Sequence, residues 1–113
     1  MTFLEILQII LAVGTIATGL ISLIWPRSVQ GFTGLNAPGP RGISEIRAVL
    51  GGGFIGLGMA PLILGAPAYQ MLGIAYLAIA VARIASIVLD RSYERSNWIS
   101  LATEIVAGII LIL

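Results

Sequence analysis

The sequence of 113 residues contains no cysteine and no histidine, and its six basic residues are all arginine, so lysine is absent as well. Without cysteine the chain cannot form a disulfide or a reactive thiolate. It also lacks the usual nitrogen and sulfur ligands of zinc and the histidine that holds haem. A histidine base, a Schiff-base lysine and a P-loop lysine are missing too. We therefore expect no metal, no cofactor and no enzymatic activity.

Charge is scarce throughout the chain. Charged residues make up 10% of the sequence and hydrophobic residues 58%, whereas an ordinary soluble domain is about 25% charged. So few charges do not cover a soluble surface, and the composition predicts a protein that sits in a lipid bilayer. The net charge of +1 gives no indication of nucleic-acid binding.

Long apolar runs are what the chain has instead. A transmembrane helix needs about 20 mostly apolar residues. Residues 3–24 carry one charge, Glu5, and residues 48–82 carry none. The second run is too long for one span, and Gly65 and Pro67 suit the end of one helix and the start of the next, so it predicts a helical hairpin. We expect one all-α membrane domain over residues 1–113, a bundle of four transmembrane helices at about 3–24, 44–64, 67–89 and 97–113.

Two loops on one side of the membrane would join these helices. Residues 25–43 are rich in proline and glycine, which is typical of turns, and include one short stretch that presents Val29, Phe32 and Leu35 to the interface. Residues 90–96 form a short charged loop. Five arginines lie in or beside these two loops, so the positive-inside rule places both loops in the cytoplasm and both termini outside. These are Arg27, Arg41, Arg47, Arg91 and Arg95.

Each predicted helix carries a stripe of small or polar residues at helical spacing, and we expect the four stripes to face one another. Small residues let helices approach closely in lipid, where the hydrophobic effect does not drive association. On the second helix the stripe is the ladder Ala48, Gly52, Gly56 and Ala60, which we interpret as a helix-packing surface. The other stripes include Ala12, Thr15, Gly19 and Ser22 on the first helix, Tyr76, Arg83 and Ser86 on the third, and Asn97, Ser100, Glu104 and Gly108 on the fourth.

Four charged residues, Glu45, Arg47, Arg83 and Glu104, are expected to form an intramembrane cluster on the side of the two loops. Arg83 lies about 9 Å inside the third predicted helix and Glu104 about 10 Å inside the fourth, at a rise of 1.5 Å per residue. Because a short loop joins these two ends, both residues come to nearly the same depth. Glu45 and Arg47 are about 200° apart around their helix. We expect Glu45 to face inward and Arg47 to reach the headgroups or a neighbouring helix.

The cluster has two interpretations. An unpaired charge in hydrocarbon costs several kcal/mol, so such groups either pair or face a wet cavity. The first interpretation is an ion-pair network that fixes helix register, and the balanced signs favour it. The second is a polar cavity for a ligand headgroup, an anion or a proton.

The chain resembles a bacterial family of small, uncharacterised four-helix membrane proteins that are described as a domain of unknown function. The resemblance is carried by Glu45-Ile46-Arg47-Ala48 followed by Gly51-Gly52, by Ala82-Arg83 with Ser86 and Asp90, and by the single acid Glu104. It extends from about residue 14 to the end of the chain. The resemblance implies a four-span bundle in which Glu45, Arg47, Arg83 and Glu104 are the characteristic polar set, and it implies no activity.

Three functions are compatible with the sequence. We expect a small non-enzymatic protein of the bacterial cytoplasmic (inner) membrane that serves as an accessory or assembly subunit of a larger complex through helix packing. Its partners would be the lipid bilayer and either another membrane protein or further copies of the chain. The alternative is a small transporter or binder of lipids or hydrophobic molecules that uses the Glu/Arg cluster. An intramembrane enzyme is disfavoured because the acids are interleaved with arginines.

Overall fold

The computed structural model describes all 113 residues, and the fold is entirely helical. Four helices are long and apolar enough to cross a membrane: α1 (Phe3–Ile24), the continuous helix Pro40–Leu64, α5 (Ala66–Asp90) and α6 (Arg95–Ile112). The second of these consists of α3 (Pro40–Glu45), the π-helical segment η1 (Ile46–Gly52) and α4 (Gly53–Leu64). A fifth, short helix, α2 (Pro26–Thr33), lies in the connection between the first two.

Local sequence signals set the ends of these helices. A capping box opens α1, in which the Thr2 hydroxyl accepts from the Glu5 N–H at 3.1 Å and the Glu5 carboxylate accepts from the Thr2 N–H. Pro26 has no N–H to continue α1 and instead begins α2. Gly65, at φ 85°, makes the tight turn between α4 and α5 that the sequence predicts.

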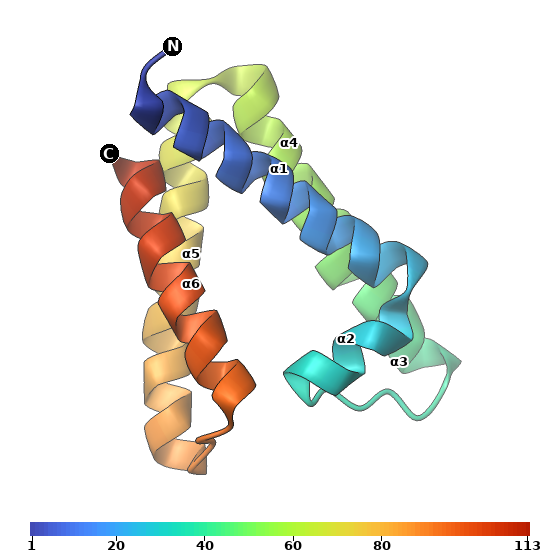
Figure 1. The fold of residues 1–113 in the computed structure, drawn as a ribbon. Coiled ribbons are helices and arrows are strands. Elements are labelled where there is room, and N and C mark those ends of the chain that lie inside the picture. The colour runs from blue at the N-terminus through green and yellow to red at the C-terminus, as the bar shows by residue number, and fades with distance from the viewer.

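The helices associate as two close pairs (Figure 1). In the first pair, α1 packs along η1 and α4 through glycines that leave no room for a side chain. A Cβ on Gly58 would lie 2.6 Å from the Ala12 carbonyl oxygen, and one on Gly19 would lie 2.6 Å from the Gly51 carbonyl oxygen. In the second pair, α5 and α6 meet at Gly73 and Gly108, where a Cβ on Gly73 would lie 2.9 Å from the Gly108 carbonyl oxygen.

The two pairs meet near the chain termini and diverge toward the other end (Figure 1). Near the termini, the Gln8 side-chain amide donates to the Ile110 carbonyl at 3.0 Å. Further along, Thr15 and Tyr76 join the pairs by a hydroxyl–hydroxyl contact of 2.5 Å. Beyond it the pairs separate, and α2 turns into the space between them toward α6 (Figure 1). We call the separated end, which carries α2 and the α5–α6 turn, the wide end.

The residues Ala12, Thr15, Gly19 and Ser22 predicted on the first helix are buried, whereas of the stripe predicted on the fourth helix Glu104 and Gly108 are buried and Asn97 and Ser100 are half-buried. The buried residues of α1 are Ala12, Thr15, Gly19 and Ser22, and those of α6 are Glu104, Ala107, Gly108 and Leu111.

The prediction that the small-residue ladder of the second helix packs against the other helices is wrong within this chain. Ala48, Gly52 and Gly56 are exposed and Ala60 is half-buried, and a Cβ on Gly52 or Gly56 would meet nothing within 4 Å. Gly51 and Gly58 face α1 in their place. The physical reason is η1, in which the Gly53 N–H donates to the Ala48 carbonyl five residues back, so a four-residue spacing does not stay on one face there.

The loop between the first two long helices is shorter than expected. The second long helix begins at Pro40, four residues before the predicted start at residue 44. The predicted short stretch at Val29, Phe32 and Leu35 falls on and just after α2. These three side chains line the space between the helix pairs, whereas the sequence suggested that they would face the membrane interface.

Candidate functional site

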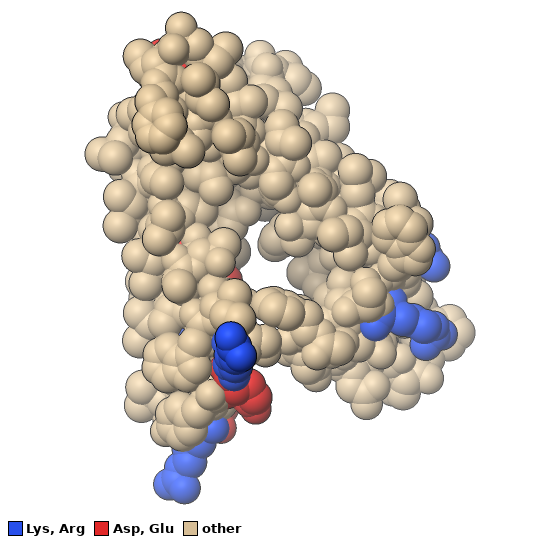
Figure 2. Space-filling model, viewed as in Figure 1, with Lys and Arg blue, Asp and Glu red and all other residues tan.

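A cavity of about 1010 Å³ lies between the two helix pairs at the wide end. Its walls come from α1, from η1 and α4, and from α5 and α6, and α2 closes part of it. Figure 2 shows the surface hollowed between the pairs, with most of the visible charged side chains gathered at the wide end. We call this space the inter-pair cavity.

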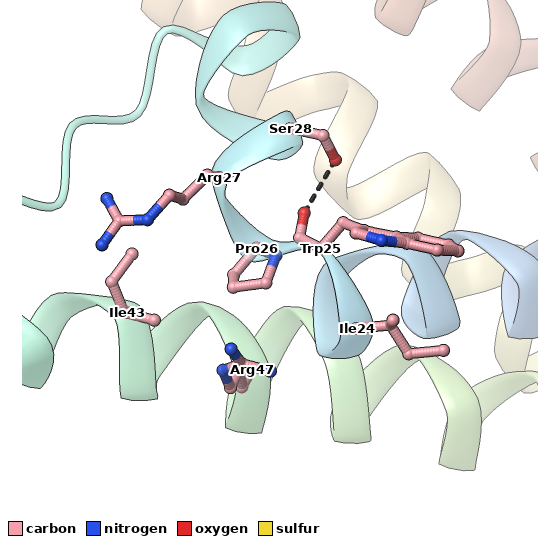
Figure 3. A pocket seen from close by; sticks show the side chains of 7 residues that line it. All are labelled: Ile24, Trp25, Pro26, Arg27, Ser28, Ile43 and Arg47. Atoms are coloured by element: carbon pink, nitrogen blue, oxygen red, sulfur yellow. Dashed lines mark hydrogen bonds between the residues drawn. The ribbon is translucent and has the colours of Figure 1, made fainter.

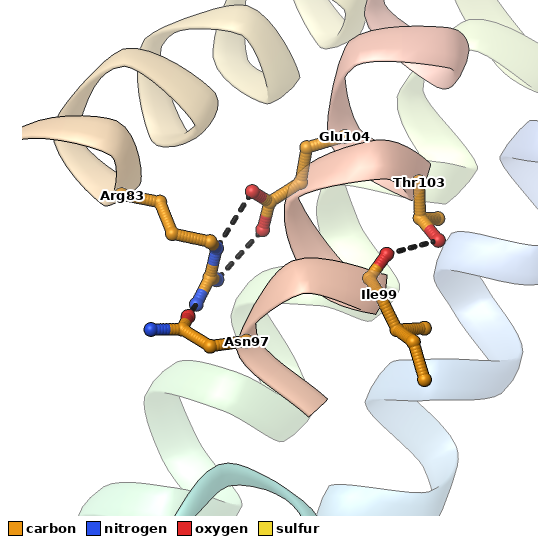
Figure 4. Close-up of polar contacts among 5 residues, drawn as sticks. All are labelled: Arg83, Asn97, Ile99, Thr103 and Glu104. Atoms are coloured by element: carbon orange, nitrogen blue, oxygen red, sulfur yellow. Dashed lines mark hydrogen bonds and ion pairs between the residues drawn. The ribbon is translucent and has the colours of Figure 1, made fainter. Parts of the chain in front are cut away.

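One wall of the inter-pair cavity carries a bidentate ion pair between α5 and α6 (Figure 4). Arg83 donates from Nε to Glu104 Oε1 at 2.8 Å and from Nη2 to Glu104 Oε2 at 2.7 Å. Its Nη1 donates to Asn97 Oδ1 at 2.8 Å. Glu104 is buried, with 8% of its surface exposed. Two parallel hydrogen bonds fix both the position and the orientation of the guanidinium, so the pair is a rigid polar wall with no net charge.

The α5–α6 turn holds Asn97 in place. The Asn97 amide donates to the Ser92 carbonyl at 3.2 Å and to the Ser92 hydroxyl at 3.0 Å. The Ser92 hydroxyl in turn donates to the Glu94 carboxylate, and this bond lowers the pKa of Glu94, with a smaller contribution from the Glu94 backbone N–H. Glu94 therefore stays ionised at the mouth of the inter-pair cavity.

Tyr76 and Ser22 bring hydroxyl groups to the lining of the inter-pair cavity. The Thr15 hydroxyl donates its only proton to the Leu11 carbonyl at 2.8 Å, so Tyr76 is the donor in the 2.5 Å contact between the two hydroxyls. On the same side, the Ser22 hydroxyl donates to the Thr18 carbonyl at 3.1 Å. The Tyr76 proton is thus used in a hydrogen bond that joins the two helix pairs.

The apolar part of the lining of the inter-pair cavity comes mostly from the first pair and α2, which also contribute the hydroxyls of Thr18, Ser22, Ser28 and Thr33. The α5–α6 wall with the ion pair is mainly polar, and most of the apolar side chains lie on the opposite wall. They are Ile21, Val29, Phe32, Leu35, Leu50 and Phe54.

Two of the four residues predicted to form one charged cluster lie elsewhere. Glu45 does not face inward but forms an exposed ion pair with Arg41, one turn earlier on its own helix. Arg47 is exposed and donates from Nη1 to the Leu23 carbonyl of α1 at 2.5 Å. The prediction of a single cluster was wrong because the helix pairs diverge at this end, which separates the start of the second long helix from Arg83 and Glu104.

Sequence reasoning missed two parts of the site. Asn97 was recognised as part of a stripe but not as a partner of Arg83, although it lies seven residues before Glu104 and hence on the same helix face. The contribution of α2 to the inter-pair cavity could not be read from its sequence, because an apolar face on a short helix fits a membrane interface equally well.

The chain belongs to the family described as Domain of unknown function (DUF4345), whose model matches residues 3–113. No curated protein and no solved structure matches the chain.

Proposed function

We propose that this member of the DUF4345 family binds an amphipathic molecule, a lipid or hydrophobic small molecule with a neutral polar end, in the inter-pair cavity. The observation that carries the proposal is the cavity itself, which has a neutral, hydrogen-bonding ion pair of Arg83 and Glu104 opposite the wall that carries most of its apolar side chains. Binding sites for small molecules commonly combine an apolar lining with a few fixed polar groups in this way.

The ion pair keeps capacity for a ligand. A guanidinium has five N–H donors, and three hydrogen bonds from Arg83 go to Glu104 and Asn97. Two donors therefore remain on the Arg83 side chain, which is 30% exposed and lines the cavity. Because the acid already balances the charge, these donors favour a hydroxyl, carbonyl or ether oxygen over an anion.

We further propose that the chain spans the cytoplasmic (inner) membrane of a bacterium, with the wide end in the cytoplasm and both termini outside. Four helices of suitable length and hydropathy support insertion. The five arginines at the wide end support this orientation, as does the placement of Trp25 and Trp98 near the same end. In this orientation the inter-pair cavity lies at the depth of the inner leaflet, where a lipid could enter from the side.

The test is to fill the cavity while keeping both residues of the ion pair. Ser100→Phe adds a ring to the cavity lining, and Thr103→Phe adds the same ring to the exposed face of the same helix, outside the cavity. Binding of a pyrene-labelled monoacylglycerol in detergent micelles is followed by energy transfer from tryptophan. We expect Ser100→Phe to abolish saturable binding and Thr103→Phe to retain it. Equal binding by both variants would refute the proposal.

A second candidate is the accessory subunit suggested by the sequence. Its support is that the ladder at Ala48, Gly52 and Gly56 faces outward with open space beside it, where a helix of another chain could approach. Gly52→Leu with Gly56→Leu should then remove a partner that copurifies in mild detergent. Gly14→Leu, at an exposed glycine of α1, is the control. Migration of the wild-type chain as a lone monomer would count against this function.

A further inference from the structure

Two arginines without an acidic partner border one pocket on the flank of the wide end (Figure 3). The pocket has a volume of about 530 Å³, and a neighbouring hollow of about 380 Å³ shares Arg27, Ile43 and Arg47 with it. We call it the basic pocket, and it shares only Ser28 with the lining of the inter-pair cavity. Its lining residues are Ile24, Trp25, Pro26, Arg27, Ser28, Ile43 and Arg47.

The charge of the basic pocket is unbalanced. The two ion pairs of the structure are Arg41–Glu45 and Arg83–Glu104, so neither Arg27 nor Arg47 takes part in one. No aspartate or glutamate lines the basic pocket or its neighbouring hollow. Glu45, the nearest acid along the chain, is held by Arg41 on its own helix. Two positive charges therefore face one space with nothing to neutralise them.

Arg47 is held in place although it is exposed. Because Pro26 has no N–H and breaks the helix after Ile24, the carbonyls at the end of α1 lack the usual backbone partners. Arg47 supplies one by donating to the Leu23 carbonyl at 2.5 Å. This bond uses one of its five donors and leaves the rest of the guanidinium facing the basic pocket. Arg27 reaches the same space from the first turn of α2 (Figure 3).

The surroundings indicate the depth of the basic pocket in a bilayer. Trp25 borders it and has 62% of its surface exposed. Exposed tryptophans at helix ends sit at the level of lipid headgroups. Guanidinium groups bind phosphate through paired N–H donors, and basic pockets between transmembrane helices bind anionic headgroups.

We propose that the basic pocket binds a phosphoryl group, supplied by the headgroup of an anionic phospholipid such as phosphatidylglycerol. Arg47 and Arg27 hold the phosphoryl oxygens, and Ile24, Ile43 and Trp25 contact the apolar part of the glycerol and acyl region. Neither arginine lines the inter-pair cavity, so this proposal stands whether or not that cavity binds a ligand.

The experiment uses tryptophan quenching by brominated lipids. The full chain in a Trp98→Phe background keeps Trp25 as its only tryptophan, beside the basic pocket. It is reconstituted with increasing fractions of dibromo-phosphatidylglycerol or dibromo-phosphatidylcholine. We expect phosphatidylglycerol to quench Trp25 at a fraction about thirtyfold lower, at about 1 kcal/mol for each of the two arginines near an anionic surface. With Trp25→Phe, the remaining Trp98 serves as a reporter outside the pocket and should show no such preference.

The matched variants remove the same charge from two places at the wide end. Arg27→Gln with Arg47→Gln should erase the preference for phosphatidylglycerol. Arg91→Gln with Arg95→Gln, on the α5–α6 side, should retain it. Arg27→Gln alone should weaken the preference about fivefold. Because this variant leaves the Arg47–Leu23 hydrogen bond intact, its effect cannot be attributed to the loss of that bond and a change in folding.

Inorganic phosphate as a competitor identifies the source of the phosphoryl group. Loss of the preference in millimolar phosphate would support the phosphoryl site and show that free phosphate also occupies it. An unchanged preference would support a site that requires the whole lipid. The proposal is overturned if both arginine pairs lower the preference equally, or if Arg27→Gln with Arg47→Gln leaves it unchanged.

Discussion

Replacing Glu104 with glutamine removes one charge of the Arg83–Glu104 pair while keeping the size of the side chain. Arg83 would then keep Asn97 as its one firm acceptor. Removing one partner of a buried ion pair costs about 3–5 kcal/mol in soluble proteins, whereas single polar contacts between membrane helices average about 0.6 kcal/mol. The pair makes two hydrogen bonds, and its side chains are 30% and 11% exposed. We therefore expect a loss of about 2 kcal/mol in the free energy of unfolding, or about thirtyfold in the folding equilibrium.

The assay is reversible unfolding in mixed micelles of rising dodecyl sulfate content. A Trp25→Phe background leaves Trp98, next to Asn97 on α6, as the reporter of the α5–α6 pair. Arg83→Gln with Glu104→Gln removes both charges and should recover about half of the loss, because no unpaired charge then remains between the helices. Glu45→Gln, which removes an exposed acid paired only with Arg41 on its own helix, is the control and should change the free energy by less than about 0.5 kcal/mol.

Two outcomes would contradict this prediction. If Glu104→Gln unfolds like the Glu45→Gln control, the buried ion pair does not stabilise the fold. If the double variant is as unstable as the sum of the single variants, the two charges act independently and the bidentate contact is not what holds α5 to α6.

Two further predictions concern packing and orientation. Gly58→Ala should lower the free energy of unfolding by about 1–3 kcal/mol, because its Cβ would lie 2.6 Å from both Ala12 O and Ile16 Cγ1, whereas Gly56→Ala should be nearly neutral in the same assay. Equal effects would mean that the two helices are not in the register described. Because the chain has no cysteine, single cysteines introduced into the loops report the orientation of the chain in the membrane. With the proposed topology, Ala66→Cys should react with a membrane-impermeant maleimide on intact cells. Asn36→Cys and Tyr93→Cys should react only after lysis. The reverse pattern would invert the topology.

The sequence was sufficient to predict the long helices and the proximity of one ion pair. Helix existence follows from the length of apolar runs, and the α4–α5 turn follows from Gly65 and Pro67, which are strong local signals. Arg83 and Glu104 could be paired because a short turn joins adjacent antiparallel helices, which fixes the depth of each residue from its distance to the turn.

The face of the second helix could not be predicted in the same way. Three consecutive glycines, Gly51 to Gly53, lie at different angles around the helix, and any of them could provide the close contact. The π-helical segment then shifts the residues on one side of it relative to those on the other. Helical periodicity assumes one constant rotation per residue, so it predicted Gly52 and Gly56 as the contact residues. In the structure, Gly51 and Gly58 make the close contacts with α1.

The pairing of the helices explains why a polar space remains in the protein. The glycine contacts that bring backbones together lie within each pair, at Gly19, Gly51 and Gly58 and at Gly73 and Gly108. Between the pairs, the polar contacts are those of Gln8 and Thr15, and neither reaches the wide end. Lipid gives no hydrophobic drive to close the remaining gap. Small side chains at the wide end would let the two helix pairs approach each other, but the large side chains of Phe54 and Arg83 lie between them. An amphipathic occupant would contact both walls of that space at once, which is why we propose ligand binding rather than helix packing as the function of the inter-pair cavity.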